Sequence, residues 1–79
     1  MKVKNHKEFA CFDYTSYKSN NYQLGDIVVN EQREIGIIIQ VHSTYDYRTD
    51  MFGNCNISEI KKASLEDIKQ YRPEILSKI

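Results

Sequence analysis

Two cysteines and two histidines are the first residues to test for chemistry, because thiol and imidazole groups bind zinc and serve as nucleophile and base. His6 and Cys11 are five positions apart, whereas His42 and Cys55 lie much farther along the chain. Structural zinc sites usually take their ligands in close pairs such as C-x2-C. Only His6 and Cys11 come near that spacing, so the sequence predicts no metal site and no cofactor.

Catalytic groups are equally sparse. Cys55, His42 and Asp46 supply the residue types of a thiol triad, but no predicted helix N-terminus or basic neighbour would stabilise a thiolate at Cys55. Asp46 and Asp50 flank Arg48 at even spacing on a predicted strand, which is more typical of a solvated face than of an acid/base pair. The three glycines are isolated, so they form no phosphate-binding loop. We therefore expect no enzymatic activity.

The tyrosines are the feature that most favours a binding surface. The chain has six tyrosines, three phenylalanines and no tryptophan, and tyrosine combines a large contact area with a polar tip. The candidate partner-binding residues, centred on the loop from Ser43 to Asp50, are Tyr17, Tyr45, Asp46, Tyr47 and Arg48. The alternative is that several tyrosines and phenylalanines complete a small core, above all Tyr22 and Phe52, which adjoin predicted strands.

The charge balance bears on nucleic acid as a second class of partner. Eleven Lys and Arg residues offset eleven Asp and Glu residues, and a net charge of zero gives no electrostatic argument for nonspecific binding to nucleic acid or membranes. Basic residues gather at only two places, which are Lys2, Lys4 and Lys7 near the start and Lys61 with Lys62 later. A nucleic-acid site would use Lys61, Lys62 and Arg48, with bases stacked on the same aromatic rings.

Length and composition indicate one small cytoplasmic domain. Seventy-nine residues suffice for a single domain with a shallow surface. Two lone thiols fit a reducing compartment, the N-terminus lacks the apolar segment of a signal peptide, and the apolar run from Ile35 to Ile39 is far shorter than a membrane span. An abundance of Ile, Lys, Asn and Tyr, residues with AT-rich codons, indicates a bacterial or phage origin.

The chain divides into an N-terminal arm (1–23), a strand-rich core (24–63) and a helical tail (64–79). We expect part of the arm to form a strand or to wrap the core. Strands are predicted at 27–29 and 34–42, then more loosely at 44–52, with a hairpin turn at Gly53-Asn54 and a last strand segment within 55–63. In the second strand Ile35, Ile37, Ile39 and Val41 alternate with Gly36, Ile38, Gln40 and His42. Gly36 marks a bend or a close backbone approach.

The tail switches to a helical period. Ser64 is a good N-cap with Asp67 three residues later, and Leu65, Ile68 and Tyr71 recur at helical spacing. Pro73 restricts Arg72, so the helix should end near Tyr71. Pro73 then begins a second helical turn that covers an open end of the core.

This arrangement resembles the small SH3-like barrels of the KOW and Tudor type. The resemblance is carried by Gly25 to Val29, Glu34 to Ile39, Phe52 to Asn54 and Ile57 to Ala63, while the loop NEQRE lacks the glycine of translation-type KOW motifs. The middle and tail are also similar to small uncharacterised proteins of Bacteroides-type bacteria and their phages. The implied fold class is mainly β: an SH3-like barrel of four or five antiparallel strands with a short C-terminal helix and an irregular arm.

The predicted function is noncatalytic protein binding through the aromatic loop surface. The expected partner is another protein, with nucleic acid as the alternative and no membrane. The sequence leaves the oligomeric state open.

Overall fold

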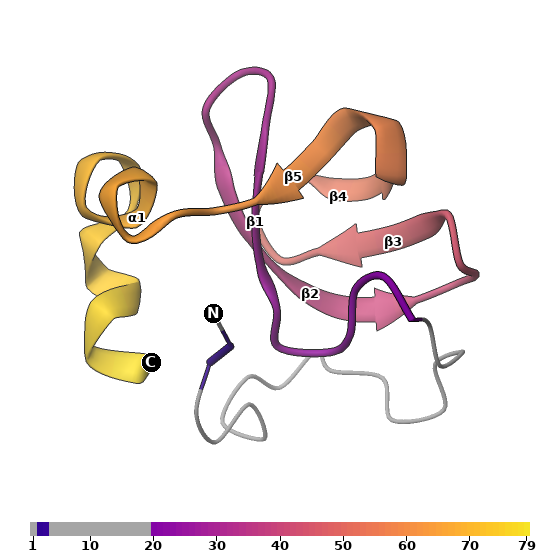
Figure 1. Cartoon of the computed structure of the whole chain (residues 1–79), viewed down its shortest axis with the longest axis horizontal. Helices are drawn as coiled ribbons and strands as arrows, with labels where there is room; N and C mark the ends of the chain where they lie inside the picture. Colours follow the sequence, from indigo (N-terminus) through magenta and orange to yellow (C-terminus); the bar gives the residue numbers. More distant parts are fainter. Residues whose placement is uncertain (1, 4–19) are drawn as a thin grey trace.

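The computed structural model describes residues 2–3 and 20–79, and within them the fold is mainly β (Figure 1). The predictions at Lys4, His6, Lys7, Cys11 and Tyr17 lie outside these residues. The strands are β1 (Ile27–Asn30), β2 (Ile35–Val41), β3 (Asp46–Thr49), β4 (Gly53–Asn56) and β5 (Ile60–Lys62). The 3-10 helix η2 (Ile57–Glu59) joins β4 to β5, and α1 (Leu65–Tyr71) and the 3-10 helix η3 (Pro73–Lys78) form the tail.

All strand pairs are antiparallel, in the order β4-β3-β2-β1-β5. Strands β1 to β4 follow one another as a meander, and β5 returns to pair with β1 through Val29 and Lys61. The predicted mainly β class with antiparallel strands is therefore confirmed. The segment 55–63, predicted as one final strand, instead contains the end of β4, the 3-10 helix η2 and the separate strand β5.

The turn between β3 and β4 lies earlier than predicted. Thr49 pairs with Gly53, so the turn is formed by Asp50 to Phe52, and Gly53 (φ 68°) begins β4. Within the turn the Phe52 amide donates to Thr49 Oγ1 at 3.1 Å, and the Asp50 carboxylate reaches β2, where Oδ1 accepts from the Ile37 amide at 2.9 Å. The prediction of a turn at Gly53-Asn54 is wrong because these two residues, in β4, already pair with Thr49 and Arg48.

Strand β2 alternates its side chains between two cores, and a bulge shifts that alternation near its end. Ile38 pairs with Thr49 and Gln40 with Arg48, which leaves Ile39 as the extra residue. One extra residue reverses the alternation of faces beyond it. Val41 therefore pairs with Tyr47 and lies in the core of Ile38, so its predicted grouping with Ile35, Ile37 and Ile39 is wrong.

The two cores lie on opposite faces of the sheet. The tail core combines β1 and β2 with the N-terminus and the helices, and its members are Val3, Ile27, Val29, Ile35, Ile37, Ile39, Ala63, Ile68 and Ile75. The inner core is formed by Tyr22, Val28, Ile38, Val41, Tyr47, Cys55 and Ile60. Gly36 is a close approach as predicted, because a Cβ there would lie 2.7 Å from Phe52 and 2.8 Å from Thr49 Cβ.

The described start of the arm is attached to the core. Lys2 forms an antiparallel bridge with Asp26, the Val3 amide donates to the Gly25 carbonyl at 2.9 Å, and Val3 is buried. In Figure 1 this short indigo segment lies beside the lower part of β1. The expectation that part of the arm packs on the core is thus confirmed for residues 2 and 3.

The tail follows its predicted boundaries. Ser64 Oγ accepts a hydrogen bond from the Asp67 amide at 3.1 Å, and the Asp67 carboxylate accepts one from the Ser64 amide at 3.0 Å. This reciprocal pair is a capping box. Helix α1 ends at Tyr71, and Pro73 begins η3. Among the described residues, no helix has both the length and the apolar character needed to cross a bilayer.

Arg72 connects the tail to the sheet. Its guanidinium makes two hydrogen bonds to the Asp50 carboxylate, at 3.0 and 2.9 Å, and one to the Ile35 carbonyl at 3.2 Å. The two charged side chains are only 15% and 14% exposed. Asp50 is therefore a structural group, and its prediction as part of a solvated face is wrong.

We expect Ile37→Ala to destabilise the domain by about 2–5 kcal/mol, because Ile37 is fully buried between β1 and the tail and its truncation leaves a cavity. Urea unfolding followed by circular dichroism measures the loss. Leu65→Ala is the control, because Leu65 is exposed and its removal should cost well under that amount. An unchanged unfolding midpoint for Ile37→Ala would contradict the central position of β2.

A second prediction concerns the tail. Asp50→Ala removes the acceptor for the Ile37 amide and both carboxylate hydrogen bonds of a largely buried guanidinium, so we expect a loss of about 2–4 kcal/mol in unfolding free energy. Glu74→Ala is the matched control: Glu74 is the other carboxylate near Arg72, at 3.5 Å, but its side chain is 68% exposed. Its removal should cost less than about 1 kcal/mol. Equal losses for the two variants would contradict the role given to Asp50.

Candidate functional site

The loop predicted as the binding surface presents one tyrosine and buries the other. Tyr45 is 62% exposed, whereas Tyr47 is 0% exposed. The Tyr47 ring meets Tyr22 edge to face, with ring centroids 5.3 Å apart, and its hydroxyl donates to the Thr44 carbonyl. The prediction of an exposed Tyr47 is wrong, because Asp46 and Arg48 point outward from β3 and strand alternation then directs Tyr47 inward.

The backbone around Tyr45 is held on both sides. Ser43 Oγ accepts from the Tyr45 amide at 3.2 Å and from the Asp46 amide at 3.1 Å. The Tyr45 carbonyl accepts from the Ile57 amide at 2.7 Å, which ties the loop to the start of η2. The backbone that carries the exposed Tyr45 ring is therefore held in place.

Beside Tyr45, the outer face of β3 and its neighbours is polar. The register sets Arg48 between Gln40 and Asn54, and Asp46 beside Asn56. Asp46 accepts from Asn56 Nδ2 at 3.1 Å and from Ser43 Oγ at 3.2 Å. Of the predicted partner-binding residues, Tyr45, Asp46 and Arg48 are thus exposed on or next to one strand.

Cys55 and His42 point to opposite faces, so the residue types of a thiol triad do not converge. Cys55 is a buried free thiol on the inward side of β4, while exposed His42 contacts Asn54 Oδ1 through Nε2 at 3.2 Å. Burial, followed by the charges of Glu59 and Asp46, raises the pKa of the Cys55 thiol from 9.0 to about 11. Residues 2–3 and 20–79 contain no group of three or more His, Cys, Asp or Glu side chains suited to a metal ion.

The predicted nucleic-acid residues do not form one surface. Lys61 and Lys62 lie on β5 and Arg48 lies on β3, with β1 and β2 between these strands in the sheet. Lys61 lines a groove together with Glu31 and Glu59, so two carboxylates lie on the same surface as its positive charge. The three basic side chains therefore make no common basic face.

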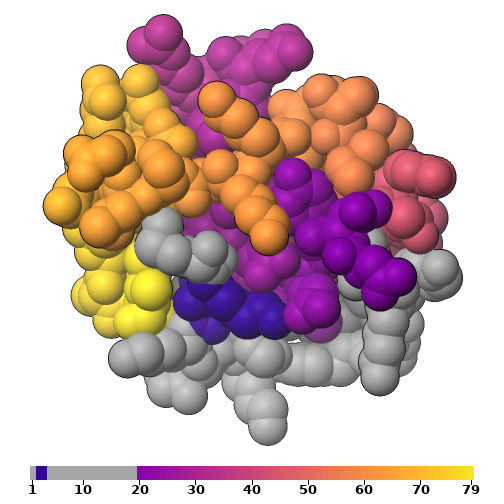
Figure 2. Space-filling view, viewed as in Figure 1, coloured from indigo at the N-terminus to yellow at the C-terminus, as the bar shows by residue number. Residues whose placement is uncertain are grey.

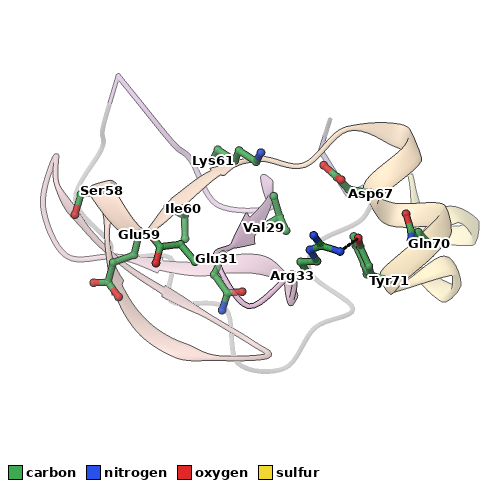
Figure 3. A pocket seen from close by; sticks show the side chains of 11 residues that line it. Val29, Glu31, Arg33, Ser58, Glu59, Ile60, Lys61, Asp67, Gln70 and Tyr71 are labelled. Carbon is green, nitrogen blue, oxygen red and sulfur yellow. Dashed lines mark hydrogen bonds between the residues drawn. The ribbon is translucent and has the colours of Figure 1, made fainter.

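This groove was not foreseen from the sequence. It has a volume of about 720 Å³ and lies between the β1–β2 loop, the segment from Ser58 to Lys61, and α1 (Figure 3). A smaller hollow of about 250 Å³ lies between the same loop and β4, and Asn30, Glu31 and Glu59 line both. The two hollows meet along this shared border.

Arg33 shapes one wall of the larger groove. It adopts a φ of 64°, in the left-handed region where glycine or asparagine is usual, and its guanidinium donates to the Tyr71 hydroxyl at 3.3 Å. Figure 3 shows this contact joining the loop to the helix. Nothing in the loop NEQRE marks a positive φ at Arg33 in the sequence, and only the packing of α1 shows what the arginine reaches.

Comparison with known proteins identifies no relative: no protein-family model, curated protein or solved structure matches the chain. The similarity to SH3-like barrels and to Bacteroides-type proteins therefore has no support from relatives. The established description is a small, mainly β fold with an antiparallel sheet and a short helix.

The raised pKa of Cys55 predicts slow alkylation. In a Cys11→Ser background at pH 8, a pKa of about 11 in place of 9.0 leaves roughly 100-fold less thiolate, so native Cys55 should react with iodoacetamide at least that much more slowly than in urea. Mass spectrometry of timed samples measures both rates. The native rate should rise with pH up to about 11. Comparable native and unfolded rates at pH 8 would contradict the buried, protonated thiol.

Proposed function

We propose that this chain is a noncatalytic protein-binding module and that Tyr45 is its central contact. The observation that carries the proposal is a large exposed ring whose backbone is hydrogen-bonded on both sides. A tyrosine side chain has only two rotatable bonds, and with its backbone already held it loses little conformational entropy when a partner covers it. Asp46 and Arg48 supply opposite charges at its border.

The same proposal includes an SH3-like barrel. Support comes from the meander of β1 to β4, from the return of β5 to the free edge of β1, and from the short 3-10 turn between the last two strands. The close approach at Gly36 and the bulge at Ile39 both curl β2, as closure of a small barrel requires. Fold by itself supplies no function, so the argument for binding stands on Tyr45.

The free Cys55 thiol supports a reducing, cytoplasmic setting. The bacterial or phage origin stays a prediction from composition. Nucleic-acid binding has less support than protein binding, because Lys61 and Lys62 are separated from Arg48 in the sheet. A salt-dependent mobility shift of single-stranded DNA or RNA would favour that alternative.

The test compares Tyr45→Ser with Met51→Ser, which truncates another exposed apolar side chain in the turn at the opposite end of β3. Both variants should unfold within about 0.5 kcal/mol of the parent. Proteins captured from a host lysate by the parent and by Met51→Ser should be lost with Tyr45→Ser, and for a purified partner the affinity should fall by about 2 kcal/mol, or roughly thirtyfold.

Partner binding that is unchanged in Tyr45→Ser, or reduced equally in Met51→Ser, would contradict the assignment of this surface. Oligonucleotide binding that is lost with Lys61→Ala but retained with Tyr45→Ser would replace it with the nucleic-acid function.

A further inference from the structure

The groove beside the β1–β2 loop lies between the end of α1 and the segment from Ser58 to Lys61. Val29 and Lys61 pair across β1 and β5, and the last residues of α1, Gln70 and Tyr71, line the groove opposite them. In Figure 2 the β1–β2 loop projects at the top of the view, between the helical tail on one side and the segment of η2 and β5 on the other. The loop thus forms a raised border between the two hollows.

The floor and the border of the groove differ in chemistry. Most of the accessible lining is polar. Tyr71 contributes a half-buried ring to the larger hollow and Phe52 one to the smaller hollow, while Val29 and Ile60 are buried beneath the larger one. Around them stand four carboxylates, Glu31, Glu34, Glu59 and Asp67, against the two cations Arg33 and Lys61. Four carboxylates and two cations give the two hollows together an excess of two negative charges, although the chain as a whole is neutral.

Few of these charges are neutralised inside the groove. Glu34 and Glu59 each accept a hydrogen bond from an uncharged group, whereas the charge of Asp67 is attracted by Lys61. Arg33 is directed to the Tyr71 hydroxyl. Glu31 is exposed at the tip of the loop. Glu31 and Glu59 are the two carboxylates that line both hollows.

We propose that this groove binds an extended, lysine- or arginine-containing segment of a partner protein. The aliphatic stems of such side chains pack on apolar and aromatic surface while their charged ends stay at the border, where the carboxylates lie. Charge complementarity selects this occupant, because an acidic segment or a nucleic-acid backbone would meet the excess of negative charge. The groove is a second surface, separate from Tyr45, and so adds to the proposed protein-binding function.

The probe is the unstructured decapeptide (Gly-Lys)5, with (Gly-Glu)5 and (Gly-Ser)5 as matched peptides. Amide chemical shifts of the labelled full chain are followed during titration at 50 mM salt. The lysine peptide should shift the resonances of Glu31, Glu59 and Tyr71, and the other two peptides should not. Binding should weaken at 300 mM salt.

Charge reversal locates the site. Glu31→Lys should weaken binding of (Gly-Lys)5 at least about tenfold, since Glu31 borders both hollows. Glu66→Lys makes the same charge change on the exposed face of α1 outside the groove and should weaken binding much less. Glu59→Gln, which keeps an acceptor for the Asn56 amide, should also weaken binding while preserving the fold. Tyr45→Ser should leave the peptide affinity unchanged, which separates this proposal from the Tyr45 surface.

Three results would overturn the proposal. The first is the absence of shifts at Glu31, Glu59 and Tyr71 at millimolar peptide. The second is an equal loss of affinity in Glu66→Lys and Glu31→Lys, which would indicate only general attraction. The third is tighter binding of a single-stranded oligonucleotide in the same groove.

Discussion

Strand β2 supplies side chains to both cores, and the bulge at Ile39 decides which core the residues beyond it enter; the rest of the fold depends on that division. Ile35 and Ile37 pack against the tail, whereas Val41 packs against Tyr47 beyond the extra residue Ile39. A domain of this size buries only about 60% of its unfolded surface, so a strand used on both faces is an efficient source of apolar contact. Without the bulge, Val41 would face away from Tyr47 and the inner core would lose one of its members.

Asp50 connects β2 to the C-terminal tail. Its carboxylate accepts from the Ile37 amide in the middle of β2 and from both terminal nitrogens of Arg72 at the end of α1. A turn, a central strand and the tail therefore meet at a single carboxylate. Because the pair is mostly shielded from solvent, each charge depends on the other, and the pair holds the end of α1 against the sheet.

The sequence was informative wherever a local rule decides the structure. The capping box at Ser64, the helix end before Pro73, the strands at 27–30 and 35–41, and the close approach at Gly36 all follow from neighbouring residues. Features set by contacts distant in sequence were missed. The bulge at Ile39 is one, since nothing in a run of isoleucines marks which residue is unpaired. The pairing of Asp50 with Arg72, across 22 positions, is another.

The candidate surfaces illustrate the same division. The outward positions of Asp46 and Arg48 already imply an inward Tyr47, so strict use of strand alternation would have separated Tyr47 from Tyr45. No local rule predicts the groove, because its walls come from a loop, a strand segment and a helix that meet only through the β1–β5 pairing and the docking of α1. In a small domain whose inward positions are occupied by core residues, the polar loop between β1 and β2 is free to carry charge. Its carboxylates are costly to bury and inexpensive to expose, so they gather at the exposed border of the groove.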